Sequence, residues 1–246
     1  MAEYAQQAQQ DYIAGRNAVA EALRSGRPAD TLFVAQGEKL GAIIALAKSQ
    51  GVVVKDVTRE KLAQLCGCAQ HQGVVLSAAA KGYAQLDDLF AAAQAKDEPP
   101  FFVLCDEIED PHNLGAILRT AEAAGAHGVI VPKRRSAPLG QAAAKASAGA
   151  IEYIPVARVS NLVATMEELK AKGLWIYGAD MDGAPYRAAK LEGPVALVIG
   201  SEGRGLGRLV RERCDGLLAL PMRGKVNSLN ASVAAGILMY EILKYR

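Results

Sequence analysis

The chain has 246 residues, of which 51% are apolar and 22% charged, and its formal net charge is only +2. This length suits two modest domains or one large one, with enough apolar residues for a core. No apolar stretch reaches the ~20 residues of a membrane span, and the polar start at Met1–Gln10 lacks the apolar core of a signal peptide, so we expect a cytoplasmic protein with an irregular N-terminus.

Short helices and strands alternate from residue 10 to residue 80, which predicts a small α/β domain. Apolar residues at helical spacing predict one helix around Ala18–Leu23 and another over Leu40–Lys48. β-Branched and apolar runs predict strands at Leu32–Ala35, Val52–Val54 and Val74–Leu76. His71 lies in the loop before the last of these strands, and we interpret it as a turn or packing residue.

Residues 81–99 have the composition of a linker, with a short helix around Leu86–Ala93 and then Pro99-Pro100, which breaks regular structure. The second domain is expected over 100–246. Its apolar runs are typical of buried parallel strands and its periodic segments of helices, so we expect a parallel sheet covered by helices on both faces. The strands are expected at Phe101–Leu104, Gly128–Val131, Leu174–Tyr177 and Val195–Ile199. The helices are expected over 114–121, 162–169 and 229–240.

Three polar turns follow strands or apolar runs of this second domain, where such sheets bind ligands. They contain Asn113 with Arg119 six residues later, Glu202 after Gly200, and Ser228 with Asn230. Capping is the simpler interpretation for three of these positions: Asp110 or Asn113 could cap the first helix, Glu202 could cap the second, and Ser228 is a good N-cap for the last. An arginine just inside a helix start, however, can grip phosphate with both arms of its guanidinium.

A dinucleotide site is the alternative for the glycine-rich turn. Gly203, Gly205 and Gly207 form a Gly-x-Gly-x-Gly run, and its spacing differs from the Gly-x-Gly-x-x-Gly of that motif. Cys66-Gly67-Cys68 is too tight for a usual zinc knuckle, and no second pair follows it, so we expect reduced structural thiols and no metal site.

Basic residues gather beside two of the candidate turns. One cluster is Lys133, Arg134 and Arg135. The other has six basic residues between Arg204 and Lys225, with Arg208 near its start. A solvated helix face is the simpler interpretation of either cluster. Their position beside the site turns favours a polyanionic substrate.

At these residues the chain resembles the SpoU (TrmH) family of RNA ribose 2′-O-methyltransferases. The resemblance extends over nearly the whole chain, and its front segment is similar to the RNA-binding domain of the branch that modifies a guanosine of bacterial large-subunit ribosomal RNA. The motifs that carry it are Asn113-Leu114-Gly115 with Arg119-Thr120-Ala121, Ile199-Gly200-Ser201-Glu202-Gly203, and Leu220-Pro221-Met222 with Ser228-Leu229-Asn230-Ala231-Ser232.

This resemblance implies a fold and a set of partners. The fold would be an α/β catalytic domain of SPOUT type, whose C-terminal segment forms a deep trefoil knot, after a small ribosomal-protein-like α/β domain. S-adenosyl-L-methionine would be held by main-chain groups of Gly200, Leu220, Met222 and Leu229. The enzyme would work on ribosomal RNA as a homodimer, with the last helix near the interface.

The resemblance also implies roles for the polar residues. Asn113, Arg119, Glu202, Ser228 and Asn230 would form the catalytic set, and Lys133, Arg134, Arg135, Arg204 and Arg208 would meet RNA. Arg119 would activate the ribose hydroxyl, which is awkward because a guanidinium is almost never deprotonated in a protein. We therefore expect Arg119 to bind the adjacent phosphate and stabilise the developing alkoxide. The alternatives are a transfer-RNA methyltransferase, an antibiotic-resistance ribosomal methyltransferase and a non-catalytic RNA-binding or ribosome-assembly protein of this fold.

Overall fold

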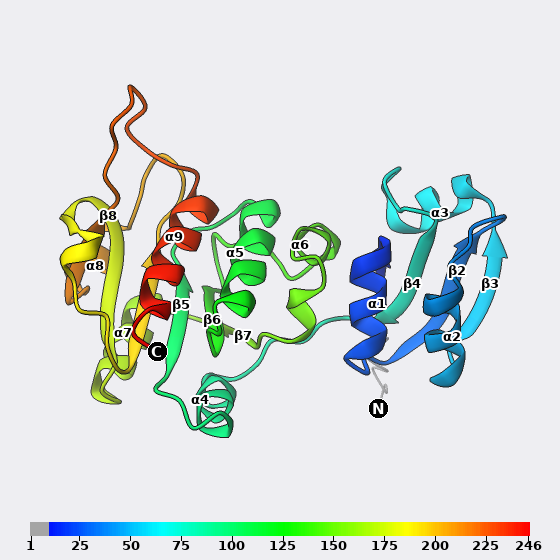
Figure 1. The fold of residues 1–246 in the computed structure, drawn as a ribbon, viewed down its shortest axis with the longest axis horizontal. Coiled ribbons are helices and arrows are strands. Elements are labelled where there is room, and N and C mark those ends of the chain that lie inside the picture. Colours follow the sequence, from blue (N-terminus) through cyan, green and yellow to red (C-terminus); the bar gives the residue numbers. More distant parts are fainter. Residues whose placement is uncertain (1–9) are drawn as a thin grey trace, which may run out of the picture. The chain divides into compact units, whose positions relative to one another are not determined.

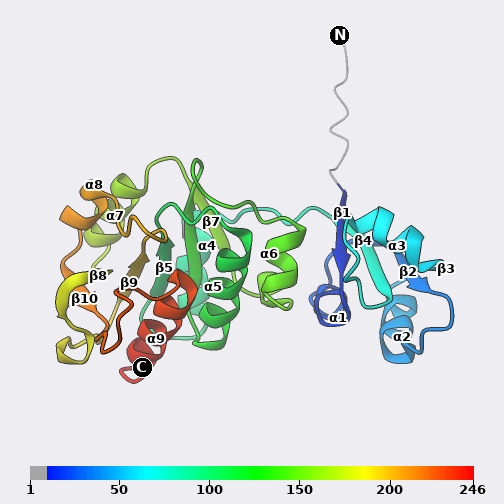
Figure 2. The same cartoon turned by 90° about the horizontal axis from the view of Figure 1, so that it is seen from above.

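The computed structural model describes residues 10–246, which fall into two compact units (Figures 1 and 2). The first unit comprises the described residues up to Gly82 together with Leu139–Tyr153, and the second comprises Tyr83–Pro138 and Ile154–Arg246. The irregular N-terminus expected over Met1–Gln10 lies outside the described residues, except for Gln10, where the first strand begins. No helix of residues 10–246 combines the length and apolar character needed to cross a membrane.

The first unit is built on a four-stranded mixed sheet. Its strands lie in the order β1 (Gln10–Ala14), β4 (Val74–Ala79), β2 (Ala29–Ala35) and β3 (Val53–Val57). β4 runs antiparallel to both of its neighbours, whereas β2 and β3 are parallel. The helices are α1 (Arg16–Arg24), α2 (Gly41–Ser49) and α3 (Arg59–Cys66). Two of these helices and three of these strands correspond to elements expected from the sequence.

The two faces of this sheet follow from the alternation of side chains along its strands. Val74 and Leu76 pack with apolar residues of α1 and α2, and Val75 packs on the other face with Leu62 and Cys66 of α3. His71 is buried, and its Nδ1 accepts a hydrogen bond from Gly73 N at 3.1 Å, which confirms that it shapes a turn. The four cysteines are unpaired.

The segment Leu139–Tyr153 belongs to the first unit, although the sequence placed it within the domain over 100–246. It contains α6 (Gln141–Ala146) and the short 3₁₀ turn η1 (Ala150–Glu152). Glu152 accepts a hydrogen bond from Arg27 Nη1 at 2.8 Å, and Tyr153 OH donates to Glu21 Oε2 at 2.5 Å. These contacts link residues more than a hundred positions apart, which no local pattern predicts.

The second unit has a six-stranded parallel sheet. The strand order is β10 (Gly216–Ala219), β8 (Trp175–Pro185), β9 (Val195–Ile199), β5 (Phe101–Cys105), β6 (Gly128–Pro132) and β7 (Val156–Val159). The helices are α4 (Leu86–Ala95), α5 (Pro111–Ala123), α7 (Leu162–Ala171), α8 (Arg208–Glu212) and α9 (Ala231–Leu243), with a 3₁₀ turn η2 (Tyr186–Ala188). The parallel sheet expected from the sequence is confirmed, and the edge strands β7 and β10 are additions to it.

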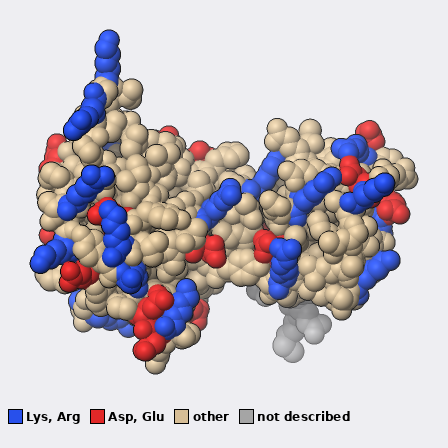
Figure 3. Space-filling view, in the orientation of Figure 1, with Lys and Arg blue, Asp and Glu red and all other residues tan. Residues whose placement is uncertain are grey.

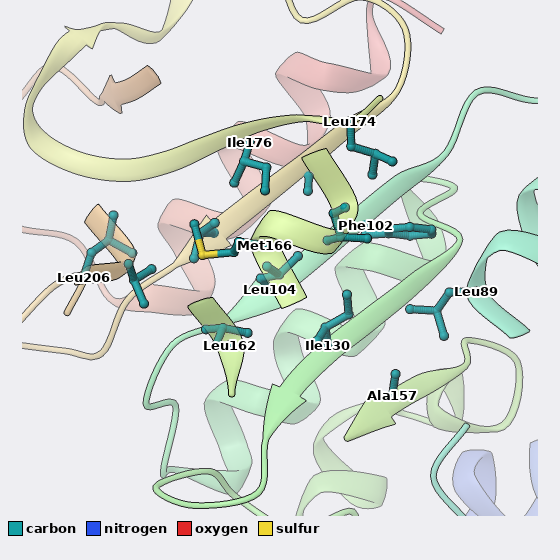
Figure 4. Close-up of a cluster of buried hydrophobic side chains, with 14 residues drawn as sticks. Leu89, Phe102, Leu104, Ile130, Ala157, Leu162, Met166, Leu174, Ile176 and Leu206 are labelled. Carbon is teal, nitrogen blue, oxygen red and sulfur yellow. The ribbon is translucent and has the colours of Figure 1, made fainter. Parts of the chain in front are cut away.

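One face of this sheet carries the core drawn in Figure 4, where Phe102 and Leu104 of β5 meet Met166 of α7 and Leu89 of α4. α5 and α9 cover the other face and pack against each other. Leu89 is fully buried and lies so close to Gly128 that a Cβ there would be 2.2 Å from Leu89 Cγ. The stretch 81–99, expected as a linker, therefore contributes a helix to the core of the second unit.

Candidate functional site

Three of the predicted polar residues meet at one end of the parallel sheet. Asn113 lies in the first turn of α5, Glu202 in the loop after β9, and Asn230 just before α9. Asn113 Nδ2 donates to Glu202 Oε1 at 3.0 Å, and Asn230 Nδ2 donates to Asn113 Oδ1 at 2.9 Å. Asn230 Nδ2 also contacts Glu202 Oε1. We call these three residues the polar triad.

The helix starts fix the orientation of these side chains. Asp110 caps α5 by accepting from His112 N at 2.9 Å, with Pro111 at the first helical position. Asn230 caps α9, because its Oδ1 accepts from Ser232 N at 3.0 Å and from Val233 N at 3.2 Å. With its oxygen occupied by the helix, the Asn230 amide can present only Nδ2 to Asn113 and Glu202.

Ser228 does not cap the last helix, so the capping interpretation made from the sequence is wrong. α9 begins at Ala231, two residues later than a Ser228 cap would require, and Asn230 makes the capping hydrogen bonds. Both residues are acceptable caps by type, and their order in the chain did not distinguish them. Ser228 instead lies exposed on the loop between β10 and α9.

A cavity of about 510 Å³ lies beside the triad. All four residues expected to hold a cofactor line it, namely Gly200, Leu220, Met222 and Leu229. Glu202 and Ser228 line it as well, and Leu218 and Leu238 add apolar surface. The structure therefore brings the second and third motifs to one cavity.

Gly200 is required by the close approach of two backbone segments. A Cβ at this position would lie 2.2 Å from the carbonyl carbon of Gly205. The loop folds back because Ser201 N donates to Gly205 O at 3.1 Å and Gly205 N donates to Ser201 O at 2.9 Å. Gly200 therefore leaves main-chain groups, rather than a side chain, facing the cavity.

Arg119 is separate from the polar triad in this chain. It lies on α5 six residues beyond Asn113, about 9 Å along the helix axis at ~1.5 Å per residue. The side chain is exposed and makes no hydrogen bond or ion pair within residues 10–246. Its guanidinium thus keeps its donors available for a ligand.

The two basic clusters meet at Glu107, which follows β5. Arg135 Nη1 donates to Glu107 Oε1 at 2.6 Å, and Arg204 Nη1 lies 3.9 Å from Glu107 Oε2. Lys133 and Arg134 are exposed next to Arg135. Arg208 is exposed and pairs with Glu212 within α8, at 2.8 Å. Basic side chains also project from the loop after β10, at the top of Figure 3, where Arg223 and Lys225 are exposed.

Two aspartates near the cavity were not singled out from the sequence. Asp106 Oδ2 accepts from Gly207 N at 2.7 Å, which ties the end of β5 to the loop after β9. Burial raises the pKa of the Asp106 carboxyl, against the opposing hydrogen bond from Gly207. The position of Asp106 directly after a buried strand is the signal that could have identified it.

Asp180 lines the cavity together with Arg211. Its Oδ2 accepts from Arg211 Nε at 2.8 Å. Burial alone would raise the pKa of the Asp180 carboxyl, but the hydrogen bonds from Arg211 and from Asp182 N outweigh it and hold that pKa below its ordinary value. The pair adds two opposite charges to a cavity that is otherwise lined largely by apolar residues and glycines.

Two family models match the chain, and together they cover most of it. The SpoU rRNA methylase family matches residues 100–240, and the RNA 2′-O ribose methyltransferase substrate-binding domain matches residues 12–84. The chain belongs to the SpoU family of RNA methyltransferases, whose cofactor is S-adenosylmethionine. The expected SPOUT-type fold is confirmed, and its knot follows from this membership rather than from the strand order.

Relatives and solved structures agree with this assignment. The Bacillus subtilis (strain 168) protein YacO, named as a TrmH family tRNA/rRNA methyltransferase, is 54% identical over 97% of each chain. The AdoMet-bound rRNA methyltransferase of Sinorhizobium meliloti is 27% identical, with a TM-score of 0.78 over 96% of this chain and 87% of that one. The A. aeolicus TrmH/SpoU tRNA modifying enzyme, 27% identical with a TM-score of 0.55, covers 61% of this chain and 76% of its own.

Proposed function

We propose that this enzyme methylates the ribose 2′-oxygen of a guanosine in large-subunit ribosomal RNA, in the cytoplasm and as a homodimer. The observation that carries the proposal is the polar triad at the rim of a cavity lined by all four expected cofactor residues. A protein that only binds RNA has no need of this arrangement. The same triad argues against a non-catalytic relative of this fold.

The cavity fits the expected cofactor. Gly200 keeps backbone groups at its surface, and the apolar side chains of Leu218 and Leu238 suit an adenine ring. The carboxylate of Asp180, next to the guanidinium of Arg211, suits the charged ends of a zwitterionic ligand. When bound, S-adenosylmethionine supplies an activated methyl group on a positively charged sulfur.

The chain must then place a ribose hydroxyl in line and stabilise the charge that develops on its oxygen. Positioning of this kind is worth roughly 7–11 kcal/mol in well-oriented reactions. The triad supplies rigid positioning groups, because each amide is committed to a hydrogen bond. Arg119, with free donors, would bind the phosphate next to the ribose and stabilise the alkoxide, while the proton leaves through phosphate or water.

The extent of the chain favours ribosomal RNA over transfer RNA. The match to the rRNA methyltransferase of Sinorhizobium meliloti covers 96% of this chain and so includes both units. The match to the tRNA modifying enzyme of A. aeolicus covers only 61% of this chain, which is close to the fraction of the chain that forms the second unit. The first unit carries the substrate-binding family model. The exposed basic residues around Glu107 would contact RNA phosphates, and such contacts weaken steeply with salt.

The last helix supports a homodimer. The sequence left open whether its apolar stripe faces the core or a partner. Val233, Ile237 and Tyr240 are 49%, 39% and 50% exposed, so this stripe is not core in the single chain. α9 packs against α5, which carries Arg119 on an exposed position. A second copy seated on the stripe would therefore lie near Arg119.

The test is transfer of a labelled methyl group to ribosomal RNA and to transfer RNA from cells that lack this enzyme, followed by mapping of the modified nucleotide. We expect a single 2′-O-methylated guanosine in large-subunit ribosomal RNA. Label on transfer RNA would show that transfer RNA, and not ribosomal RNA, is the substrate. Label on a nucleobase, or no binding of S-adenosylmethionine in a titration, would overturn the reaction itself.

A further inference from the structure

A second cavity lies in the first unit and shares no residue with the cavity beside the polar triad. Its volume is about 430 Å³, and it is lined by Arg16, Asn17, Glu38, Arg59 and Gln72. These residues come from the start of α1, the loop after β2, the start of α3 and the loop before β4. Four separate segments therefore converge on a hollow that contains two arginines and one carboxylate.

Glu38 holds the two arginines in a fork. Its Oε2 accepts from Arg16 Nη2 at 2.8 Å, and its Oε1 accepts from Arg59 Nη2. The Glu38 side chain is only 16% exposed, whereas those of Arg16 and Arg59 are 50% and 62% exposed. The carboxylate thus lies beneath the two guanidinium groups, which stay open to solvent. The cluster carries one net positive charge.

The Arg16 side chain is fixed further by the loop before β4. Arg16 Nε donates to Gln72 O at 3.2 Å, and Gln72 Oε1 accepts from Arg16 N at 2.8 Å. Gln72 has a φ of 53°, in the left-handed region that residues other than glycine rarely adopt. The next residue, Gly73, has a φ of 79°, and a Cβ there would be 2.7 Å from Glu38 Cγ. Strain of this kind is typical of ligand clamps.

The chemistry of this fork matches an anion with several oxygens. The Nη1 groups of both arginines make no hydrogen bond to a residue of the described chain, and Arg59 Nε makes none either. Guanidinium groups bind phosphate oxygens through paired N–H donors, which makes arginine the preferred residue for this contact. Over α3, basic and acidic side chains lie together at the surface in Figure 3.

We propose that Arg16 and Arg59 form a built phosphate clamp that grips the RNA backbone in the first unit, with Glu38 and Gln72 as its positioning residues. This deepens the proposed function, because it assigns the substrate-contacting side chains of the RNA-binding unit. The clamp reads the backbone and not base identity, so it contributes affinity and register.

The experiment measures binding of the full chain to a transcript of large-subunit ribosomal RNA at several salt concentrations. We expect Arg16→Ala and Arg59→Ala each to weaken binding about three- to tenfold near 0.15 M salt, and to reduce the slope of log affinity against log salt by roughly 0.7–0.9 for each phosphate that the variant no longer neutralises. Arg24→Ala is the matched control, because Arg24 is 60% exposed and pairs with Glu21 in the same unit outside the cavity. It should leave affinity and slope unchanged.

Conservative variants separate the clamp from a structural bridge. Arg16→Lys and Arg59→Lys keep the charge, so the salt slope should stay within error of wild type while affinity falls about two- to fourfold because lysine cannot make the forked contact. Thermal melting and S-adenosylmethionine binding should match wild type in these variants. Alanine variants that melt normally and bind RNA with wild-type affinity and slope would overturn the clamp.

Inorganic phosphate distinguishes an RNA site from a free-anion site. At matched ionic strength we expect phosphate to weaken RNA binding by wild type more than chloride does, and to lose this advantage in the alanine variants, because RNA phosphates and free phosphate would share the same paired donors. Phosphate that binds wild type through these arginines without weakening RNA binding would overturn an RNA-backbone role. The result is independent of the proposed substrate. If wild type methylates transfer RNA instead, the same variants are measured on transfer RNA. Wild type that methylates ribosomal RNA with unchanged binding in the variants refutes the clamp alone.

Discussion

Asn230 Nδ2 donates a hydrogen bond to Asn113 Oδ1 at 2.9 Å, although the two residues are 117 positions apart in the chain. This contact joins the start of α9 to the start of α5, two helices that pack against each other on one face of the sheet. It fixes the direction of the hydrogen bonds within the whole triad. The α9 backbone orients Asn230, Asn230 orients Asn113, and both amides point their hydrogens at Glu202.

Asn113→Ala should disable methyl transfer while sparing the cofactor. The substitution removes the donor to Glu202 and leaves the Asn230 amide without its acceptor on α5. We expect single-turnover transfer to fall by about 10²–10³, the usual loss when one preorganised donor is removed from an active site. Calorimetry should give an S-adenosylmethionine affinity within threefold of wild type, because Asn113 does not line the cavity. Parallel loss of cofactor binding would contradict this division of roles.

Asn230→Ala and Asn161→Ala form a matched pair. Both asparagines are N-caps whose side-chain oxygens accept from helix backbone N–H groups, Asn161 on α7 and Asn230 on α9. Each substitution should lower the free energy of unfolding by about 1 kcal/mol, as measured in urea. Transfer activity should collapse only in Asn230→Ala, because only Asn230 contacts Glu202 and Asn113. Equal activities in the two variants would show that Asn230 acts only as a helix cap.

Arg119→Ala should reduce methyl transfer by about 10²–10³ through loss of charge stabilisation, with Arg119→Lys intermediate because lysine keeps the charge but not the forked geometry. Arg119 makes no hydrogen bond or ion pair within the described chain, so both variants should fold and bind the cofactor normally. If Arg119 stabilises charge without losing a proton, single-turnover rates of wild type and Arg119→Lys should vary with pH in parallel. An ionisation in wild type that shifts in the lysine variant would favour Arg119 as the base.

Asp106→Asn should remove a pH-dependent destabilisation. Burial raises the pKa of Asp106 in the folded protein above its ordinary value of 3.8. The folded state then binds the proton more tightly than the unfolded state, so the free energy of unfolding falls as pH rises from about 3.8 through the raised pKa. Asparagine can still accept from Gly207 N but does not ionise. Urea midpoints of wild type should fall relative to those of the variant across this pH window, and parallel curves would refute the assignment.

The sequence predicts those parts of the fold and site that depend on local patterns. Continuous apolar runs located β5, β6, β8 and β9, and the turns after β5 and β9 located Asn113, Gly200 and Glu202. Strand order places Asp106 against Gly207, and long-range packing places Leu89 beneath Gly128. Contacts of this kind depend on which strands are neighbours, and side-chain periodicity carries no information about that order. β7 and β10 were missed for another reason: with four residues each, they are too short for a clear pattern.

Ile237→Asp should convert a dimer to a monomer. Ile237 lies in the middle of the exposed apolar stripe of α9, and an aspartate there would bury an unpaired charge in any partner contact. Sedimentation at micromolar concentration should give twice the chain mass for wild type and a single chain mass for the variant. The stability of the isolated chain should change little, because the side chain is 39% exposed.

The control for Ile237→Asp is Leu209→Asp. Leu209 is an exposed apolar residue of the same unit, 51% exposed on α8. Leu209→Asp should leave the dimer intact. The comparison then distinguishes loss of a specific interface from a general effect of added negative charge. Methyl transfer should fall in Ile237→Asp and persist in Leu209→Asp if a second copy lies beside Arg119. A monomeric wild type would contradict the proposed dimer. An Ile237→Asp variant that dimerises with unchanged affinity would show that the interface lies elsewhere.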